Sequence, residues 1–202
     1  MLFNEKEKKM LGGEYGPGIR RAMELLVKLG NSFDAEKLVP ISYGHIGYDS
    51  CPEDFWNLMT EGVTKTPHRV TTHPSFQPEI WKEWRLPLAD RWIDEHERKL
   101  KTFKQLGWLR TETCAEYLIG IMPRKGDIVS MGGSCMQVAN NSLFGARVDR
   151  MGILVSLAAA VSGRTPLMGL LLPENRYANH LAVLDDLDVT NWTLSHYHCL
   201  GY

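Results

Sequence analysis

The sequence IVSMGGSCMQVANNSLFGAR, residues 128–147, changes its hydrophobic pattern at a pair of glycines. The residues before Gly132 form an apolar run typical of a buried strand, and those after Gly133 have helical spacing. The pattern predicts a strand over 127–131 that runs through a glycine turn into a helix over 134–144. Such strand-to-helix units are the building blocks of α/β folds.

Strand and helix patterns alternate along the rest of the chain as well. Helices are expected at 5–12, 17–30, 53–59, 87–106, 115–122 and 151–161, and strands at 37–42, 69–72, 108–113 and 167–172. This alternation predicts an α/β fold for residues 1–202 as one domain, with a length that fits a compact domain or a half-domain. Ligand sites of α/β sheets gather at strand carboxyl ends. We therefore expect the strands before Cys114 and Ser134 to be neighbours, with both residues at the same edge of the sheet.

The composition excludes several classes of protein. Apolar residues make up 44% and charged residues 23% of the chain, the proportions of a globular protein. The net charge of −1 provides no field to attract nucleic acid or a membrane surface, so neither is expected as a partner. The charged amino terminus lacks the apolar core of a secretory signal, and the longest apolar run, 151–161, is shorter than the roughly 20 residues of a membrane span. A cytoplasmic protein is expected.

The cysteines are widely spaced, which favours thiols or metal ligands over disulfides. There are four, without a C-x-x-C pair: Cys51, Cys114, Cys135 and Cys199. Each could equally be a buried apolar thiol.

The turn from Gly132 to Cys135 is a candidate anion-binding site. Backbone N–H groups at the start of a helix hold anions through their unpaired donors and the helix dipole. A tight turn followed by Ser134 as the helix N-cap would have the same sequence. Cys135, near the first helical position, would be stabilised there as a thiolate or would fill the core as a small residue.

Polar residues interrupt the apolar pattern of the helix that follows. A buried amide costs free energy unless it is hydrogen-bonded, so we expect partners close to Asn140, Asn141 and Ser142. Arg147 and Arg150 offer fixed positive charge for a carboxylate or phosphate, and capping of the helix C-terminus explains them equally well.

Two histidine patterns are further candidates. His45 lies among glycines at an expected strand end, where α/β proteins place their sites, or it is a satisfied turn histidine. His196, His198 and Cys199 form an H-x-H-C pattern that suggests a metal site. In a strand, however, Cys199 would face away from both histidines, and chance clustering explains the pattern as well.

Four segments, in this order, resemble the aconitase X family of dehydratases. EKKMLGGEYG (7–16) resembles the family opening E-x-x-M-L-x-G-x-x-G. In the family this opening is followed by a helix and then by a strand that ends in S-x-H-I. TETCAEYL (111–118) resembles T-C-T-P-Y-L and places Cys114 on the family's cysteine and Tyr117 on its tyrosine. NSLFGAR (141–147) resembles N-S-V-L-G-A-R, and SLAAAVSGRTPLMGLLLPENR (156–176) resembles A-L-A-A-A-I-T-G-R-T-P-L-Y-G-L-H-L-x-E-N-R.

The resemblance covers essentially the whole chain and implies the amino-terminal half of a large subunit. It implies a hydro-lyase acting on a small hydroxy acid such as phosphomevalonate or cis-3-hydroxyproline, with an iron–sulfur cluster or a mononuclear iron as cofactor. It also implies that a carboxy-terminal half and a small swivelling subunit with a catalytic serine complete the enzyme. By position on the matching motifs, Cys114 is the implied metal ligand. The residues implied to line the substrate pocket are Ser42, His45, Ser134, Asn141, Ser142 and Arg147, with Arg147 pairing an acidic group.

Two segments depart from the family pattern. Gly133-Ser134-Cys135 stands where E-S-S or E-S-N is usual, so a carboxylate is missing and a thiol occupies the third place. GARVDRM (145–151) stands where G-A-R-T-N-R-E is usual. These departures support a second hypothesis, a non-catalytic or assembly subunit derived from the family.

Overall fold

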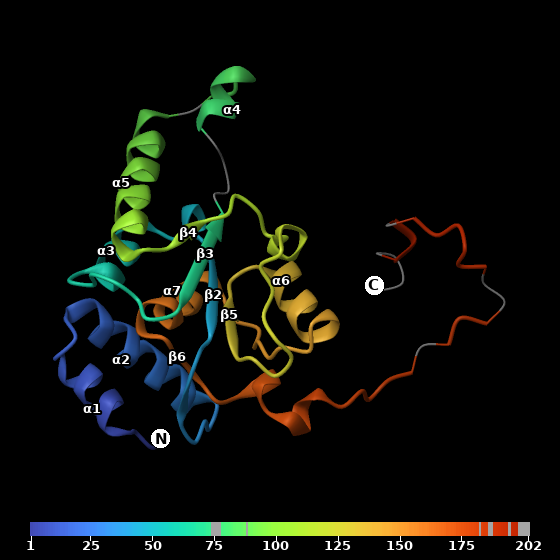
Figure 1. The fold of residues 1–202 in the computed structure, drawn as a ribbon, viewed down its shortest axis with the longest axis horizontal. Helices are drawn as coiled ribbons and strands as arrows, with labels where there is room; N and C mark the ends of the chain where they lie inside the picture. Colours follow the sequence, from blue (N-terminus) through green and yellow to red (C-terminus); the bar gives the residue numbers. More distant parts are fainter. Residues whose placement is uncertain (74–77, 88, 182, 186–187, 194, 198–202) are drawn as a thin grey trace.

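A four-stranded parallel sheet lies at the centre of the computed structural model, which describes residues 1–73, 78–87, 89–181, 183–185, 188–193 and 195–197 (Figure 1). The strand order is β4-β3-β2-β5, with β2 at Tyr43–Gly47, β3 at Arg69–His73, β4 at Leu109–Arg110 and β5 at Val129–Met131. All three strand pairings are parallel. The carboxyl ends of the four strands therefore share one edge, the carboxyl edge, and their amino ends share the opposite, amino edge.

Helix α7, Ile153–Ser162, covers one face of this sheet. A Cβ built on Gly44 of β2 would lie 3.5 Å from the Cβ of Ala160, so small residues on both elements let the helix pack closely. Helix α2, Pro17–Ser32, packs on α7, while α1, Glu5–Gly12, and α3, Glu53–Thr60, extend this layer. The large side chains buried in this main core include Met23, Leu26, Ile46, Trp56 and Leu157.

The opposite face of the sheet carries a second, smaller core. Side chains alternate along a strand, so Tyr43 and His45 point away from α7 while Gly44 and Ile46 point towards it. Tyr43 packs with Met131 and with Met136 of helix α6, Ser134–Val138, and Cys114 packs against the same cluster. A single 3₁₀ turn, η2, Glu116–Ile119, follows Cys114.

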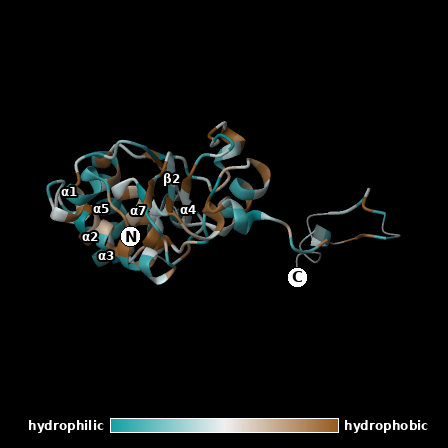
Figure 2. Cartoon of the chain, turned by 90° about the horizontal axis from the view of Figure 1, so that it is seen from below, coloured by the Kyte–Doolittle hydropathy of each residue, from teal (hydrophilic) through white to brown (hydrophobic). Residues whose placement is uncertain are grey.

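The remaining elements lie at the periphery. An antiparallel pair is formed by β1, Leu38–Pro40, and β6, Arg164–Pro166. Helices α4, Pro78–Glu83, and α5, Asp90–Leu106, and the 3₁₀ turns η1, Tyr48–Ser50, η4, Gly169–Leu171, and η5, Pro173–Arg176, complete the set. Beyond Arg176 the described chain leaves the body of the molecule (Figures 1 and 2), and Leu181 there is 88% exposed. In the described ranges, no helix combines the length and apolarity that a membrane crossing requires.

The α/β class and most helices are as the sequence predicts. Asn4 caps α1 through a reciprocal pair of hydrogen bonds with Glu7, and Gly13 and Gly107 end α1 and α5 in the left-handed conformation. One expected strand is wrong: the strand expected at 167–172 lies instead at 164–166, before Gly169 with its φ of +51°. The strand expected at 37–42 is present as β1, and β2, which was not expected, follows it in the other sheet.

The helix expected over 134–144 changes form at Ala139. Residues Ala139–Leu143, labelled η3, form a π-helical turn after α6. The amides of Asn140 and Asn141 donate to the carbonyls of Met136 and Gln137, four residues earlier, at 2.7 and 3.0 Å. These side chains compete with the backbone for its acceptors, which widens the turn. The helix expected over 115–122 is likewise only the turn η2, because Gly120 ends it with a φ of +81°.

The expectation that the strands before Cys114 and Ser134 are neighbours is wrong. They are β4 and β5, the two edge strands, with β3 and β2 between them. All five residues of β2 are buried, and burial on both faces is what places a strand in the middle of a parallel sheet. Cys114 and Ser134 nevertheless both follow strand carboxyl ends, and so both lie at the carboxyl edge.

Candidate functional site

The residues expected to line one pocket separate between the two edges of the sheet. Cys114 and Ser134 follow the carboxyl ends of β4 and β5. Ser42 instead precedes β2, and its backbone N–H and hydroxyl donate to the Ile128 carbonyl at 2.9 and 3.1 Å. Arg147 forms an isolated parallel β-bridge with Ile128, the residue before β5. Its backbone N–H donates to the Asp127 carbonyl at 2.8 Å. Ser42 and Arg147 are thus at the amino edge.

At the amino edge, the side chains of Asn141 and Arg147 form hydrogen bonds with backbone groups. The amide of Asn141 donates to the Val148 carbonyl at 2.8 Å and its oxygen accepts from the Val148 N–H, so the expected partners of this residue are present. The Arg147 guanidinium donates to the Leu171 carbonyl at 2.8 Å. Arg176, which the sequence did not single out, donates to Asn141 and to the Ala146 carbonyl. The substrate roles of Asn141, Arg147 and the exposed Ser142 stay predictions.

Arg150 lies apart from this group. It lines a pocket of about 560 Å³ at the start of α7, together with Leu29, Phe33, Asp149 and Met168. Neither it nor Arg147 makes the helix C-terminal hydrogen bonds that capping would require among the contacts described for this segment.

His45 is a buried residue within strand β2, so the prediction that it lies in a turn at a strand end is wrong. It is 0% exposed, in the middle of β2. Its Nδ1 lies 3.0 Å from the Thr71 hydroxyl and 2.8 Å from Oε1 of Glu116. Glu116 is also 0% exposed, and its Oε1 accepts from the Thr111 hydroxyl at 2.9 Å. These four side chains join β2, β3 and the two segments flanking Cys114 into one buried polar network.

Burial dominates the electrostatics of this network. Removal from water raises the pKa of Glu116 to about 8. Its Oε2 has no hydrogen-bond partner among the described residues, so the cost of an ionised carboxylate here is only partly offset. At neutral pH the Glu116 side chain is therefore largely protonated, and His45 faces a neutral acid.

The raised pKa of Glu116 predicts a pH-dependent stability. An unfolded glutamate releases its proton near pH 4.5, whereas native Glu116 keeps it to about pH 8. The native state then binds more protons between these values, so the free energy of unfolding falls as pH rises, by up to about 1.4 kcal/mol per pH unit. Urea unfolding of the wild type and Glu116→Gln at pH 5, 6.5 and 8 measures this, since glutamine mimics the protonated acid and removes the fall. Equal pH dependence in both proteins would contradict the assignment.

At the carboxyl edge, Cys114 meets Cys135. Cys114 is half-buried and Cys135 is exposed, and their thiols are hydrogen-bonded to each other. Burial, and then the neighbouring Cys135, raises the pKa of Cys114 to about 11. Cys114 is thus a thiol rather than a thiolate nucleophile at neutral pH.

The two glycines of the turn before Cys135 have different roles. A Cβ on Gly132 would lie 2.7 Å from the Cδ1 of Ile153, so a larger residue where β5 passes the start of α7 would displace the end of that side chain. A Cβ on Gly133 would meet nothing within 4 Å, and its φ of −96° suits any residue. Gly133, rather than Ser134, is the N-cap of α6, which corrects the N-cap interpretation of that serine. The space beside Gly133 is therefore open.

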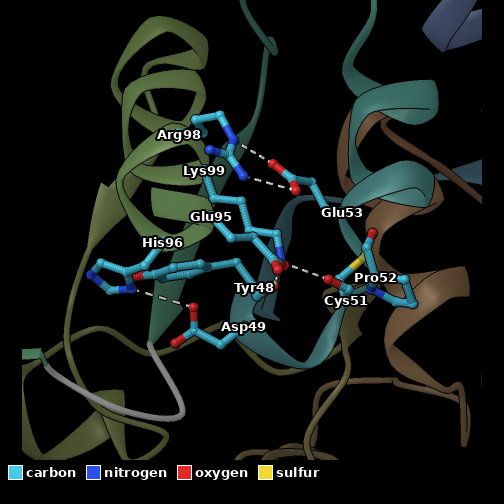
Figure 3. Close-up of polar contacts among 9 residues, drawn as sticks. All are labelled: Tyr48, Asp49, Cys51, Pro52, Glu53, Glu95, His96, Arg98 and Lys99. Atoms are coloured by element: carbon cyan, nitrogen blue, oxygen red, sulfur yellow. Dashed lines mark hydrogen bonds and ion pairs between the residues drawn. The ribbon is translucent and has the colours of Figure 1, made fainter. Parts of the chain in front are cut away.

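A second buried polar network holds the segment that leaves β2 (Figure 3). Lys99 of α5 is 1% exposed, and its Nζ donates to the carbonyls of Tyr48 and Cys51 at 3.1 and 2.6 Å and to Glu95. On the same helix, Nδ1 of His96 lies 3.4 Å from Asp49. Helix α5 is therefore held by buried charged groups as well as by its apolar face, and Trp92 of this helix is 44% exposed.

Exposed apolar side chains lie on the elements that carry or follow the two cysteines. They come from η2, α6, η3 and the residues next to them: Leu118, Ile119, Met122, Val138 and Leu143. The rings of Tyr117 and Phe144 are in contact, with centroids 5.4 Å apart, so the two groups of elements adjoin. Large apolar side chains exposed together on adjoining elements are typical of a surface where another polypeptide segment packs.

Metal-ligand candidates are few. In the ranges that the structure describes, no group of three or more His, Cys, Asp or Glu side chains could hold a metal ion. The H-x-H-C pattern cannot be placed, because His198 and Cys199 lie outside the described residues. The described residue of that pattern, His196, bonds to Thr193. The metal-ligand candidates at the carboxyl edge are the thiols of Cys114 and Cys135.

Comparisons with known proteins agree with the fold and with these segments. A family model described as "Aconitase X first domain" matches residues 1–174. The phosphomevalonate dehydratase large subunit of Methanocaldococcus jannaschii is 35% identical over 211 residues, which cover 100% of this chain and 52% of that protein. The cis-3-hydroxy-L-proline dehydratase of Hypocrea jecorina is 29% identical over 210 residues, covering 99% and 34%.

A solved structure gives the same result in three dimensions. The crystal structure of Thermococcus kodakaraensis aconitase X in its holo-form matches with a TM-score of 0.75 at 30% identity, covering 88% of this chain and 45% of that one. The chain spans about half the length of the curated relatives that it matches most fully.

Proposed function

The chain belongs to the aconitase X family, and from this premise we propose that it forms the amino-terminal half of a hydro-lyase that removes water from a small hydroxy acid. The observation that carries the proposal is the meeting of Cys114 with the Gly132–Cys135 turn at the carboxyl edge of a family-typical sheet. Phosphomevalonate and cis-3-hydroxyproline are the substrates to test, because relatives are named for dehydrating them.

Loss of water requires that a hydroxyl departs and that a proton is removed from the neighbouring carbon. The iron centre implied by the family supplies Lewis-acid assistance to the departing hydroxyl when it is bound. The thiol of Cys114 fits such a centre, being a soft donor at the surface of the carboxyl edge. His45 and Glu116 are buried and Thr111 is partly buried; the three are positioning residues that hold the segments on both sides of Cys114.

Ser134 is the other candidate at this edge. It is exposed at the first position of α6, beside the open space at Gly133. Its hydroxyl is a donor and an acceptor, suited to the carboxylate or hydroxyl of a substrate. Ser42, Asn141, Ser142 and Arg147, at the amino edge and in the π-helical turn, would contribute only if further polypeptide brings substrate there.

Completion by other polypeptide segments is part of the proposal. The exposed apolar side chains on η2, α6 and η3 and the length of the relatives support a carboxy-terminal half that covers the carboxyl edge. The first relative is a large subunit by name, which supports a small partner subunit as well. Residues 1–202 would then act as one domain within a larger assembly.

Iron binding by the completed assembly tests this function. Cys114→Ser is expected to lose most of the iron and sulfide and the associated visible absorbance after anaerobic reconstitution, because a serine oxygen is a poorer ligand for iron–sulfur chemistry. Cys51→Ser and Cys199→Ser are the matched controls and are expected to keep the centre. Retention of the centre by all three variants, or its loss only from Cys199→Ser, would contradict the role of Cys114.

A further inference from the structure

Cys114 reaches Cys135 across the whole width of the sheet. Cys114 follows β4 and Cys135 follows β5, the two opposite edge strands, yet their thiols are hydrogen-bonded. Two anchors fix this crossing. The N–H and the hydroxyl of Thr111 both donate to the Thr72 carbonyl on β3, at 3.0 and 3.1 Å. Glu116 contacts His45 on β2 at 2.8 Å. The segment between them is thus held over β3 and β2 so that Cys114 arrives at β5.

The outer side of the thiol pair is open. Cys135 is exposed and Cys114 is half-buried against the second core. The Cβ position of the adjacent Gly133 has nothing within 4 Å, so no side chain of the described part of the molecule fills the space beside the pair there. An ion and further ligands could approach the sulfur atoms from this side.

We propose that Cys114 and Cys135 together form a two-thiolate metal site, with Cys135 as a second ligand that this chain contributes to the centre. Two thiolates on one tetrahedral metal ion lie about 3.8 Å apart, given metal–sulfur bonds of about 2.3 Å. The two thiols are already hydrogen-bonded to each other, and each releases its proton when the metal binds. The identification of the metal as iron rests on the proposed function; the pairing of the thiols rests on this chain's own geometry.

The thiol of Cys135 follows directly after the open turn at Gly133 and Ser134. A softer ligand set shifts metal preference towards thiophilic ions. With two sulfur donors present, the remaining coordination positions stay available to ligands from a covering segment and to substrate.

Titration of Co²⁺ into the reduced chain under anaerobic conditions tests the site, with near-ultraviolet sulfur-to-cobalt charge-transfer absorption as the readout. The wild type is expected to show this band. Cys114→Ser and Cys135→Ser are each expected to lower its intensity to about half and to weaken Co²⁺ binding at least about tenfold, and the double variant to abolish it. Cys51→Ser and Cys199→Ser serve as controls that keep the band. Far-ultraviolet circular dichroism establishes that each variant is folded.

Full intensity in Cys135→Ser would overturn the proposal, and so would the absence of the band from the wild type. Loss of the band from both controls would assign the thiolates elsewhere and overturn it as well. None of these results depends on iron retention in the assembled enzyme, which tests the proposed function through Cys114→Ser. The two failures are therefore distinguishable.

Discussion

Replacing Lys99 with methionine is expected to lower the free energy of unfolding by about 3 kcal/mol. Methionine keeps the apolar stem but removes the buried ammonium group that joins the Tyr48 and Cys51 carbonyls to Glu95. Both carbonyls then lose a charged donor in a site where Lys99 was 1% exposed. Because these carbonyls belong to the segment leaving β2, the loss also loosens the carboxyl edge.

Urea unfolding followed by tryptophan fluorescence measures this effect. Lys101→Met is the matched control on the same helix; Lys101 is exposed, so its replacement is expected to change stability by less than about 0.5 kcal/mol. Adding Glu95→Gln to Lys99→Met is expected to recover part of the loss, since it removes the carboxylate left without its cation. Equal effects at Lys99 and Lys101 would show that the buried ammonium group contributes no specific stability.

The second large effect is expected in catalysis. The chain alone should give no dehydration of phosphomevalonate or cis-3-hydroxyproline above the rate without enzyme, since catalysis at the typical acceleration of 10⁶ or more requires a complete set of positioned groups. The chain spans 52% of its relative from Methanocaldococcus jannaschii. Product formation with the chain alone, and with the carboxy-terminal half and small subunit of that relative added, measures this expectation.

Turnover that appears only in the mixture would support the half-enzyme. Robust turnover by the chain alone would contradict it. A stable mixture that binds substrate without turning it over would instead favour the non-catalytic subunit, with the open position at Gly133 as its structural basis. In that case Gly133→Glu, which the free space around that residue tolerates, is the variant to test for recovery of activity.

The buried histidine shows where prediction from the sequence stopped. His45 stands between glycines, and glycine usually indicates a turn, but here Gly44 lies within β2 and faces α7, where a Cβ would be 3.5 Å from that of Ala160. A local pattern does not distinguish a glycine in a turn from one in a strand that packs against a helix. No local pattern indicated the role of Glu116. Its partners Thr111 and His45 lie five and 71 residues away in the sequence.

The sequence by itself determined the class of fold, the positions of most helices and the membership of the family, because these depend on local periodicity, capping residues and short motifs. Asn4, Gly13, Gly107 and the glycine turn before α6 act on their immediate neighbours. Only the tertiary structure decided the order of the strands, the separation of Ser42 and Arg147 from Cys114, and the meeting of Cys114 with Cys135. These depend on which distant segments bury surface against each other, and the free energy of that burial is a property of the assembled core rather than of any segment.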